Sequence, residues 1–436
     1  MSFLLKREMS APTVGIFLAV GLLHPVVGLA ADVVVEPGPE ALRQAIAAAT
    51  PGDTLRLQPG SYGPATVDRP LVLEGGEGKA VVDGGGKGSA LTINAPDVMV
   101  RGLTLTGSGT VDTDLDGGVL VVKGGDRAVI EDNRILGNLY GVAIQGAQKV
   151  VVRHNRIANR DDLWINDRGN GINIWNSSGS LFEGNRVEGG RDGLYIHTAH
   201  GNIIRGNRFT RLRFAVHYMF ANHNEVTDNI SIGNGVGYAL MYSEHLKIQR
   251  NISLNDRDHG LMFHSSHHSV LDHNLVRGTK EKCSFIYTSS FNTMHHNRFE
   301  GCDIGIHFTG GSEKNIIHDN AFVNNHTQVK YSGMVHYEWS KDQRGNYWSD
   351  NPAFDLNGDG IADVAYRPNT LMDRVVWNYP LAKLLLASPV METLRLAQGR
   401  FPTLNPGGVV DSWPLIAPPP DPVTLPPDLE TPQRNP

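Results

Sequence analysis

Histidine and methionine residues return at matching places in a short pattern along this chain. Residues 215–219 read A-V-H-Y-M, residues 237–241 read G-Y-A-L-M and residues 260–264 read G-L-M-F-H. Each copy begins with a small residue, and the second and fourth residues after it carry the chemistry. These positions hold His197, His217, Met219, Met241, Met262, His264 and His307. Imidazole and thioether groups together favour a soft ion, above all Cu(I), whereas carboxylate and carbonyl oxygens favour calcium or magnesium.

The same pattern predicts on which side of a strand these residues lie. Alternation over four or five residues predicts a half-buried strand, in which the first and third residues after the small one face the core. The inward residues are apolar in the five copies that begin at Gly193, Ala215, Gly237, Gly260 and Gly305. The coil between 264 and 305 departs from the trend, because Ile286 and Thr288 take the two outward positions.

We therefore expect an outer face that carries a ladder of soft ligands. Stacked coils lie about 4.8 Å apart. The ladder contains His197, Met219, Met241 and His264, with His217, Met262 and His307 beside it. We interpret it as a copper or partner surface, because exposed methionine is unusual. The alternative is that another segment covers the face and these side chains pack beneath it. Further histidines in neighbouring turns are read singly as solvated loop residues: His200, His223, His245, His259, His267 and His268.

A second metal pattern lies at 355–363, where the chain reads D-L-N-G-D-G-I-A-D. Asp355, Asn357, Asp359 and Asp363 take positions 1, 3, 5 and 9 of a calcium loop. Position 12, which usually holds a bidentate Glu, is Tyr366. The two interpretations are a calcium site and an ordinary Asp/Asn-Gly turn.

Composition, charge and the N-terminus indicate an exported protein. Residues 1–30 have the basic start, apolar centre and small-residue end of a signal peptide, and the alternative is an uncleaved anchor. The expected location is the periplasm. The net charge of −6 and the absence of a basic run argue against nucleic-acid binding. Export allows a disulfide between Cys283 and Cys302, and two buried thiols are the alternative.

Internal repetition predicts the fold that positions these residues. An Asn followed by a short apolar stretch recurs 22 or 23 residues apart, with one interval of 30, at Asn133, Asn155, Asn185, Asn207, Asn229, Asn251, Asn274, Asn297 and Asn320. A unit this short cannot bury its own apolar face, so units must stack. Asn tolerates left-handed backbone geometry, suits the bend between strands, and can hydrogen-bond along the stack. The prediction is an all-β, right-handed parallel β-helix of roughly eleven or twelve coils.

The ends of the chain suggest how the solenoid is closed and divided. Residues 40–49 predict an amphipathic helix that covers the first coil. We expect the β-helix with its cap at 31–344, a short helical capping or docking region with the Asp/Asn-rich loop at 345–398, and a mobile Pro-rich tail at 399–436.

The rival function is an exported enzyme that cleaves or epimerises acidic polysaccharides, as many parallel β-helices do. Hydrolysis needs two or three carboxylates gathered on one sheet. The outward positions above hold no Asp or Glu, and the best candidates, Asp258-His259 and Asp161-Asp162, lie in turns of different coils. We therefore favour a non-catalytic carrier over a lyase, hydrolase or epimerase.

Several motifs together resemble the NosD family. They are the entry A-I-A-A-A-T-P-G-D-T-L-R-L-Q-P-G-S-Y, the Asn turns, G-N-Y-W-S-D at 345–350, the D-x-N-x-D-G-x-x-D run and P-x-x-x-L-x-x-x-S-P at 380–389. The resemblance implies a periplasmic protein that helps to supply copper for the copper–sulfur site of nitrous oxide reductase. It also implies an ABC-transporter permease and ATPase, a copper chaperone and the reductase as partners, and attachment to the membrane through the permease. The motifs specify no copper ligands.

Overall fold

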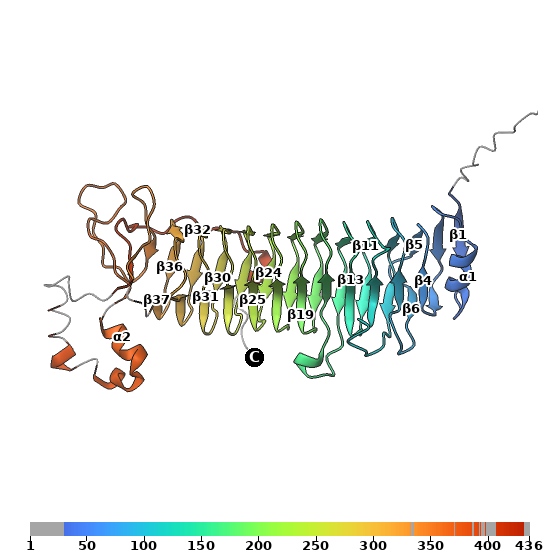
Figure 1. The fold of residues 1–436 in the computed structure, drawn as a ribbon, viewed down its shortest axis with the longest axis horizontal. Coiled ribbons are helices and arrows are strands. Elements are labelled where there is room, and N and C mark those ends of the chain that lie inside the picture. Colours follow the sequence, from blue (N-terminus) through green and yellow to red (C-terminus); the bar gives the residue numbers. More distant parts are fainter. Residues whose placement is uncertain are drawn as a thin grey trace, which may run out of the picture.

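The fold is a right-handed parallel β-helix closed at both ends, as the repeat predicts (Figure 1). The computed structural model describes residues 30–331, 333, 335–369, 371–385, 388–391, 393, 397 and 407–430. The expected signal peptide and the 391–397 stretch lie wholly or mostly outside the described residues. In the part of the chain that is described, no helix combines the length and the apolar character needed to cross a membrane.

Three long parallel sheets form the sides of the solenoid, and we call them sheets A, B and C. Sheets A and B have 13 strands each and sheet C has 12, so the stack is longer than the eleven or twelve coils expected. Sheet A consists of β1 (Asp32–Val35), β2 (Thr54–Leu57), β5 (Val72–Gly75), β8 (Met99–Arg101), β11 (Val129–Glu131), β14 (Val151–Arg153), β17 (Leu181–Glu183), β20 (Ile203–Arg205), β23 (Glu225–Thr227), β26 (Lys247–Gln249), β29 (Val270–Asp272), β32 (Thr293–His295) and β35 (Ile316–His318).

Sheet B follows sheet A in each coil, after a sharp turn. It consists of β3 (Gly60–Tyr62), β6 (Ala80–Asp83), β9 (Thr104–Thr106), β12 (Arg134–Leu136), β15 (Arg156–Ala158), β18 (Arg186–Glu188), β21 (Arg208–Thr210), β24 (Ile230–Ile232), β27 (Ile252–Leu254), β30 (Leu275–Arg277), β33 (Arg298–Glu300), β36 (Ala321–Val323) and β39 (Tyr347–Trp348).

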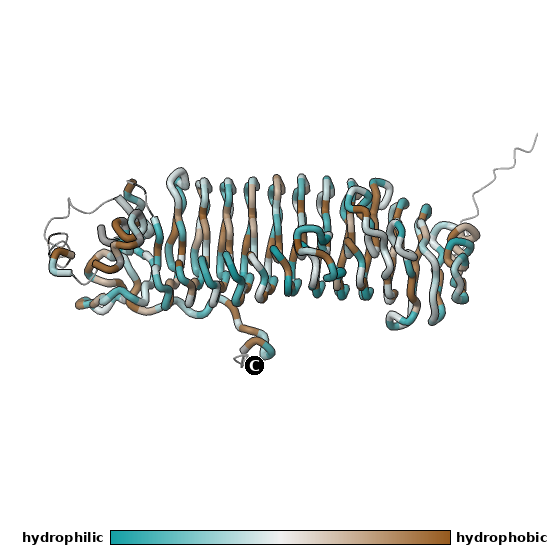
Figure 2. Tube along the Cα trace, turned by 90° about the horizontal axis from the view of Figure 1, so that it is seen from below, coloured by the Kyte–Doolittle hydropathy of each residue, from teal (hydrophilic) through white to brown (hydrophobic). Residues whose placement is uncertain are grey.

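Sheet C has the longest strands and carries the His/Met pattern. It consists of β4 (Ala65–Val67), β7 (Leu91–Ile93), β10 (Gly117–Val121), β13 (Tyr140–Gln145), β16 (Ile172–Trp175), β19 (Asp192–His197), β22 (Phe214–Met219), β25 (Val236–Met241), β28 (His259–His264), β31 (Lys282–Tyr287), β34 (Ile304–Phe308) and β37 (Thr327–Lys330). Figure 2 shows the coils side by side, with hydrophobic and hydrophilic residues alternating along them.

The Asn residues form a buried ladder at the turn between sheets A and B. Each Asn amide donates to the side-chain oxygen of the next Asn at 2.8–3.1 Å, from Asn133 to Asn320 and on to Asn346. The ladder prediction is confirmed. The prediction that Asn itself takes the left-handed backbone is wrong, because the residue before it does, with φ of 52–63°. The Asn side chain must instead point inward to reach the next coil.

The two ends are closed by different devices. Helix α1 (Ala41–Ala48) covers the first coil with Leu42 and Ile46 buried, as predicted. At the other end, Trp348 stacks on Phe322 at 4.3 Å between ring centroids. The repeat ends later than Gly345, because Asn346 and β39 add one more partial coil.

The C-terminal segments return to the solenoid. Strand β38 (Tyr337–Glu338) pairs with β40 (Val409–Val410), and the region also contains α2 (Leu371–Asn378), η2 (Pro380–Leu385) and α4 (Pro427–Glu430). Figures 1 and 2 place the end of the described chain beside the middle of the solenoid. The Pro-rich tail was expected to be mobile, but Asp428 binds Arg208 at 2.6 Å and Asp421 binds Arg298 at 3.3 Å.

The two cysteines form a disulfide, which settles the alternative left open by the sequence. Cys283 begins the core-facing part of β31, and Cys302 lies in the turn after β33, with 5.7 Å between their Cα atoms. Both are almost fully buried.

Candidate metal-binding sites

The strand register of sheet C brings most of the predicted soft ligands together. Along one row of the outer face, His197, Met219, Met241 and His264 are register partners in consecutive coils. In the parallel row, His217, Ala239 and Met262 are register partners. The predicted ladder is therefore present as a geometric feature of β19, β22, β25 and β28, and all six His and Met side chains are partly exposed.

At the centre of this face, the small residue Ala239 lies between His217 and Met262. It points outward, yet it is fully buried because longer neighbours on both rows surround it. Neighbouring coils are about 4.8 Å apart and alternate residues of one strand about 6.7 Å apart. The five neighbours on these two rows thus place two imidazoles and three thioethers on three sides of the small Ala239, and they are His217, Met219, Met241, Met262 and His264. We call these five residues and Ala239 the His/Met ring.

The next coil ends the ring instead of extending it. The outward residues of β31 are Phe285 and Tyr287, the register partners of Met262 and His264. The expectation of Ile286 and Thr288 is wrong by one residue, because Cys283 and not Ser284 takes the position of the small residue. His307 lies beyond Phe285 and is not brought together with the other predicted ligands.

One ring histidine is held by a buried carboxylate. His217 Nδ1 lies 2.8 Å from Asp192 Oδ2, and Arg213 contacts both oxygens of the same carboxylate at 2.8 and 2.7 Å. Burial alone would raise the pKa of Asp192, but the hydrogen bonds from His217 and Arg213 outweigh it and hold the pKa below its ordinary value. Ionised Asp192 can only accept a hydrogen bond, so His217 donates from Nδ1, and Nε2 is the ring nitrogen left to bind a metal.

His307 has a different environment. Burial and the nearby Lys330 and Lys282 lower its pKa to about 4, and its Nδ1 has no hydrogen-bond partner. It is therefore a neutral imidazole apart from the ring, next to Phe285 at 5.0 Å between ring centroids.

Exposed aromatic rings border the ladder along the turn after sheet C. Phe220 stacks on Tyr242 at 5.2 Å, and His264 packs between the rings of Tyr242 and Tyr287. A second column of stacked rings contains His223, His245, His268 and Phe291. His223, His245 and His268 were expected to be individually solvated, but in the structure their rings stack on one another.

The Asp/Asn-rich loop uses its side chains to hold its own backbone. Asp355 accepts from the N–H groups of Gly358 and Gly360 at 2.6 and 2.8 Å, and Asp363 accepts from Leu356 N–H at 2.7 Å. These bonds form the Asp/Asn-Gly turn that was the alternative interpretation. The calcium interpretation stays a prediction.

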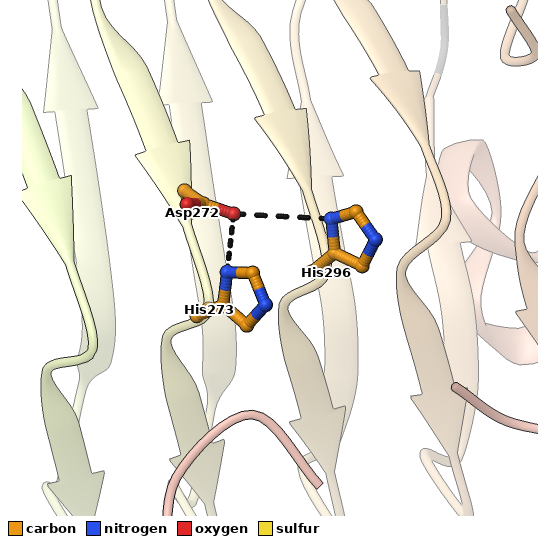
Figure 3. Close-up of side chains that lie close together, drawn as sticks. All are labelled: Asp272, His273 and His296. Carbon is orange, nitrogen blue, oxygen red and sulfur yellow. Dashed lines mark hydrogen bonds and ion pairs between the residues drawn. The ribbon is translucent and has the colours of Figure 1, made fainter. Parts of the chain in front are cut away.

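A cluster of histidines that the sequence pattern did not single out lies where β29 and β32 turn towards sheet B. The ligand atoms of Asp272, His273 and His296 gather within 4.8 Å of one another, which is close enough for them to hold one metal ion (Figure 3). His295 also reaches Asp272, with Nδ1 2.9 Å from Oδ1. We call Asp272, His273, His295 and His296 the His/Asp cluster.

The sequence contains a pattern that indicates this cluster. In the coils of Asn274, Asn297 and Asn320, the two residues before the ladder Asn are only His or Asp, and they read Asp272-His273, His295-His296 and His318-Asp319. An alignment on Asn rather than on the small residue of sheet C would have placed Asp272 and His295 in register, as the structure does.

Comparisons with known proteins identify close relatives. Residues 158–353 match the family model described as periplasmic copper-binding protein (NosD). The chain is 42% identical to a probable ABC transporter binding protein NosD of Pseudomonas aeruginosa, over 83% of this chain and 87% of the relative. It is 41% identical to the protein of the same name from Stutzerimonas stutzeri, over 83% of this chain and 86% of the relative.

The comparison with solved structures concerns the fold alone. A family 28 exopolygalacturonase from Yersinia enterocolitica superposes with a TM-score of 0.50 at 9% identity, over 74% of this chain and 79% of the enzyme.

Proposed function

Because the chain belongs to the NosD family of periplasmic copper-binding proteins, we propose that it handles copper without catalysis and works with an ABC transporter in assembling the copper–sulfur site of nitrous oxide reductase. The observation that carries the copper-handling part is the His/Met ring around Ala239. The partners in this proposal are the transporter permease and ATPase, a copper chaperone and the reductase. The site of action is the periplasm.

The donor set of the ring supports Cu(I) as its ion. Three thioethers and two imidazoles are soft to intermediate ligands and include no carboxylate, so hard ions such as calcium or magnesium gain little there. The Asp192–His217 hydrogen bond adds the outer contact that orients a metal-binding histidine and raises its basicity. His197 extends the site by one coil, as the register partner of Met219. His307 belongs to this proposal only as a separate site beyond Phe285.

The open position of the ring suits transfer rather than storage. Its side chains are partly exposed and lie on strands, which hold them in place without enclosing the ion. A partner can therefore reach a bound Cu(I) from outside and exchange ligands with it. We propose that the aromatic column of Phe220, Tyr242 and Tyr287 forms the adjoining contact surface for the protein that delivers or accepts copper.

Titration with Cu(I) under reducing conditions, in competition with a chromophoric chelator, tests the ring. We expect one Cu(I) to bind, and we expect the Met219→Ala/Met241→Ala/His264→Gln variant to bind at least tenfold more weakly. Met99→Ala is the matched control, because Met99 is a half-exposed methionine of β8 on sheet A. Unchanged binding in the triple variant would remove these residues from the site.

The same variants connect the ring to the pathway. In a strain that lacks this protein, we expect nitrous oxide reductase to contain less copper, and the native chain or Met99→Ala to restore it. The triple variant should not restore it. Normal copper content in the deletion strain would overturn the proposed role.

The C-terminal region supports attachment to the permease. Tyr379, Leu381, Leu384 and Val390 are exposed by 70, 82, 85 and 67%, which is unusual for apolar side chains on one short segment. We expect Leu381→Glu/Leu384→Glu to reduce copurification with the permease. Leu356→Glu is the control, because Leu356 is 84% exposed in the Asp/Asn-rich loop. Equal recovery of all three proteins would place the contact elsewhere.

We also propose calcium binding by Asp355, Asn357, Asp359 and Asp363, supported by the exposed oxygen atoms of this loop. Calorimetric titration with calcium should show one site that Asp355→Asn removes. Equal heats for the native chain and the variant would leave the loop as a turn.

A polysaccharide hydrolase would need two or three carboxylates gathered on one sheet, and the outward positions of the His/Met pattern on sheet C hold no Asp or Glu. Of the candidate acids in turns, Asp162 is hydrogen-bonded by Arg160, and this bond lowers its pKa to about 2. A group with that pKa is a poor general acid near neutral pH. Cleavage or epimerisation of alginate or pectin by the purified chain would contradict the carrier proposal.

A further inference from the structure

Three imidazoles converge on one carboxylate oxygen in the His/Asp cluster. Asp272 Oδ1 lies 2.6 Å from His273 Nδ1, 2.9 Å from His295 Nδ1 and 3.8 Å from His296 Nδ1. The Nδ1 atoms of His295 and His296 are themselves 2.8 Å apart. Figure 3 shows Asp272 directed towards His273 and His296 from the neighbouring coil. Three imidazole nitrogens therefore lie within 3.8 Å of one carboxylate oxygen at the surface.

These spacings suit a tetrahedral metal ion. Ligands with bonds of 2.0–2.1 Å to zinc lie about 3.3 Å from one another in a tetrahedron. The observed separations of 2.6–3.8 Å lie on both sides of that value.

The backbone beneath the cluster is firmly held. His273 and His296 are the left-handed residues of their turns, with φ of 54° and 53°. The Asn that follows each of them belongs to the buried ladder, where Asn274 donates to Asn297 at 2.8 Å. The register of β29 and β32 also fixes Asp272 beside His295. The ligand positions are thus set by the most regular part of the fold, as a preorganised site requires.

Other coils use the same positions differently. Where the carboxylate is Glu131 or Glu183, the next coil supplies Arg153 or Arg205 at 2.5–2.7 Å. A guanidinium is a permanent counter-charge but cannot bind a metal, whereas a neutral imidazole is a weak counter-charge and a good ligand. At Asp272 the chain replaces the expected Arg by His295 and adds His273 and His296. The replacement changes an ion pair into a set of metal ligands.

We propose that Asp272, His273, His295 and His296 bind one divalent first-row transition ion, of the class of Zn²⁺ or Cu²⁺. Nitrogen and carboxylate donors without sulfur favour these ions over Cu(I). The site lies at the turn between sheets A and B and shares no residue with the His/Met ring on sheet C, so it is independent of the proposed copper handling. Half-exposed His273 and His296 give the ion a path from solvent. His296 also lines a cavity of about 370 Å³ with Asp319 and residues 415–420.

Metal-free full-length protein, titrated with Zn²⁺ in competition with a fluorescent chelator, tests the proposal. We expect one Zn²⁺ per chain, and we expect Asp272→Asn and His296→Gln each to weaken binding by at least tenfold. Co²⁺ in place of Zn²⁺ should give the intense visible bands of a four-coordinate ion in the native chain and lose them in both variants. Thermal unfolding of the metal-free variants shows whether the fold is kept.

His245→Gln is the matched control, because His245 is also a left-handed turn histidine, stacked between His223 and His268. It should bind Zn²⁺ as the native chain does. The proposal is overturned if the native chain binds no more tightly than the His273→Gln/His295→Gln/His296→Gln variant. It is also overturned if His245→Gln weakens binding as much as His296→Gln. Cu(I) affinity should be unchanged in all these variants, and its loss would instead count against the separation of the two sites.

Discussion

At the scale of single residues, one hydrogen bond decides what His217 can offer a metal. Asp192 precedes His217 by 25 residues and is fully buried, so no short motif connects the two in the sequence. The sequence predicted that His217 faces outward, because alternation along a strand determines the face. It could not predict the carboxylate that orients the ring, because that contact depends on how adjacent coils align.

Asp192→Asn tests this contact. An amide can present N–H to His217, which favours the tautomer whose Nε2 carries the proton and cannot bind a metal. We expect Cu(I) affinity to fall about 10–100-fold, the usual range when an outer partner of a metal ligand is lost. Competition titration measures the affinity, and Asp272→Asn on the other face is the control. Equal affinity in the two variants would show that Asp192 only supports the fold.

In one coil, two adjacent small residues made the strand register ambiguous from the sequence. Cys283 and Ser284 are adjacent and similar in size, so the pattern alone gives two possible registers. In the structure, Cys283 takes the position of the small residue and is buried in a disulfide. Phe285 and Tyr287 therefore point outward. A shift of one residue exchanges the two faces of a strand.

At the scale of elements, the Asn ladder holds the turns between sheets A and B. Asn251 shows its full pattern, since its amide donates to Val226 O at 2.7 Å and to Asn274 Oδ1 at 3.0 Å. Its own Oδ1 accepts from both the backbone and the side chain of Asn229. The 22–23-residue spacing predicted this ladder correctly, because identical turns must stack in register. It could not predict which residue of the turn takes the left-handed conformation.

Asn251→Ala should destabilise the solenoid by about 3 kcal/mol. Each buried donor or acceptor that loses its partner costs about 1–3 kcal/mol. The substitution removes the side-chain donor to Val226 O and the acceptor of the Asn229 backbone N–H. Denaturant unfolding followed by circular dichroism measures the change. Gln249→Ala on the same coil is the control and should change the stability by less than 0.5 kcal/mol, roughly the range of surface substitutions. A similar loss in both variants would contradict a special role for the ladder.

The C-terminal cap depends on one buried carboxylate. Asp411 accepts from Asn346 N–H at 2.7 Å and from Trp348 Nε1–H at 2.8 Å, which attaches β40 to the end of the ladder. Burial raises the pKa of Asp411 to about 6 despite these bonds. Its folded-state pKa is therefore higher than the ordinary value of 3.8, so the folded cap binds the proton more tightly than the unfolded chain.

The free energy of unfolding of the cap should therefore fall as the pH rises from about 4 to about 6, because Asp411 loses its proton over this range. Above pH 6 this free energy should no longer change through Asp411. The contribution of Asp411 is about 3 kcal/mol, from roughly two pKa units at 1.36 kcal/mol each. Hydrogen–deuterium exchange of residues 407–416 at pH 4.5 and 7, corrected for intrinsic rates, measures it. In Asp411→Asn, which does not titrate, the exchange should no longer depend on pH in this way. Protection of the native cap that increases over this range would refute the assignment.

At the scale of the whole molecule, the C-terminal tail lies against sheet B, which also carries a row of arginines. Arg134, Arg156, Arg186 and Arg208 are register partners in consecutive coils. The acidic tail residue Asp428 binds the last of them, Arg208 in β21. Asp421 binds Arg298 in β33, which lies four coils further along sheet B. Sequence composition predicted a mobile tail, because proline-rich segments cannot form a core of their own. Composition could not reveal the row of arginines, because its members are distributed over 75 residues.

Reversing the tail charges should release the tail without unfolding the solenoid. Exposed ion pairs contribute only about 0–1 kcal/mol each, so Asp421→Lys/Asp428→Lys should leave the thermal unfolding of the β-helix almost unchanged. The same variant should be cleaved faster by a protease within residues 417–430, because lysine now faces Arg208 and Arg298. Since the substitution itself creates sites for trypsin, thermolysin is the suitable protease, and Asp112→Lys/Asp114→Lys in an exposed loop is the control. Equal cleavage of the tail in all three proteins would mean that proline contacts along β24 and β27, and not charge, hold it, because Pro422 and Pro426 lie beside Ile230 and Ile252 there.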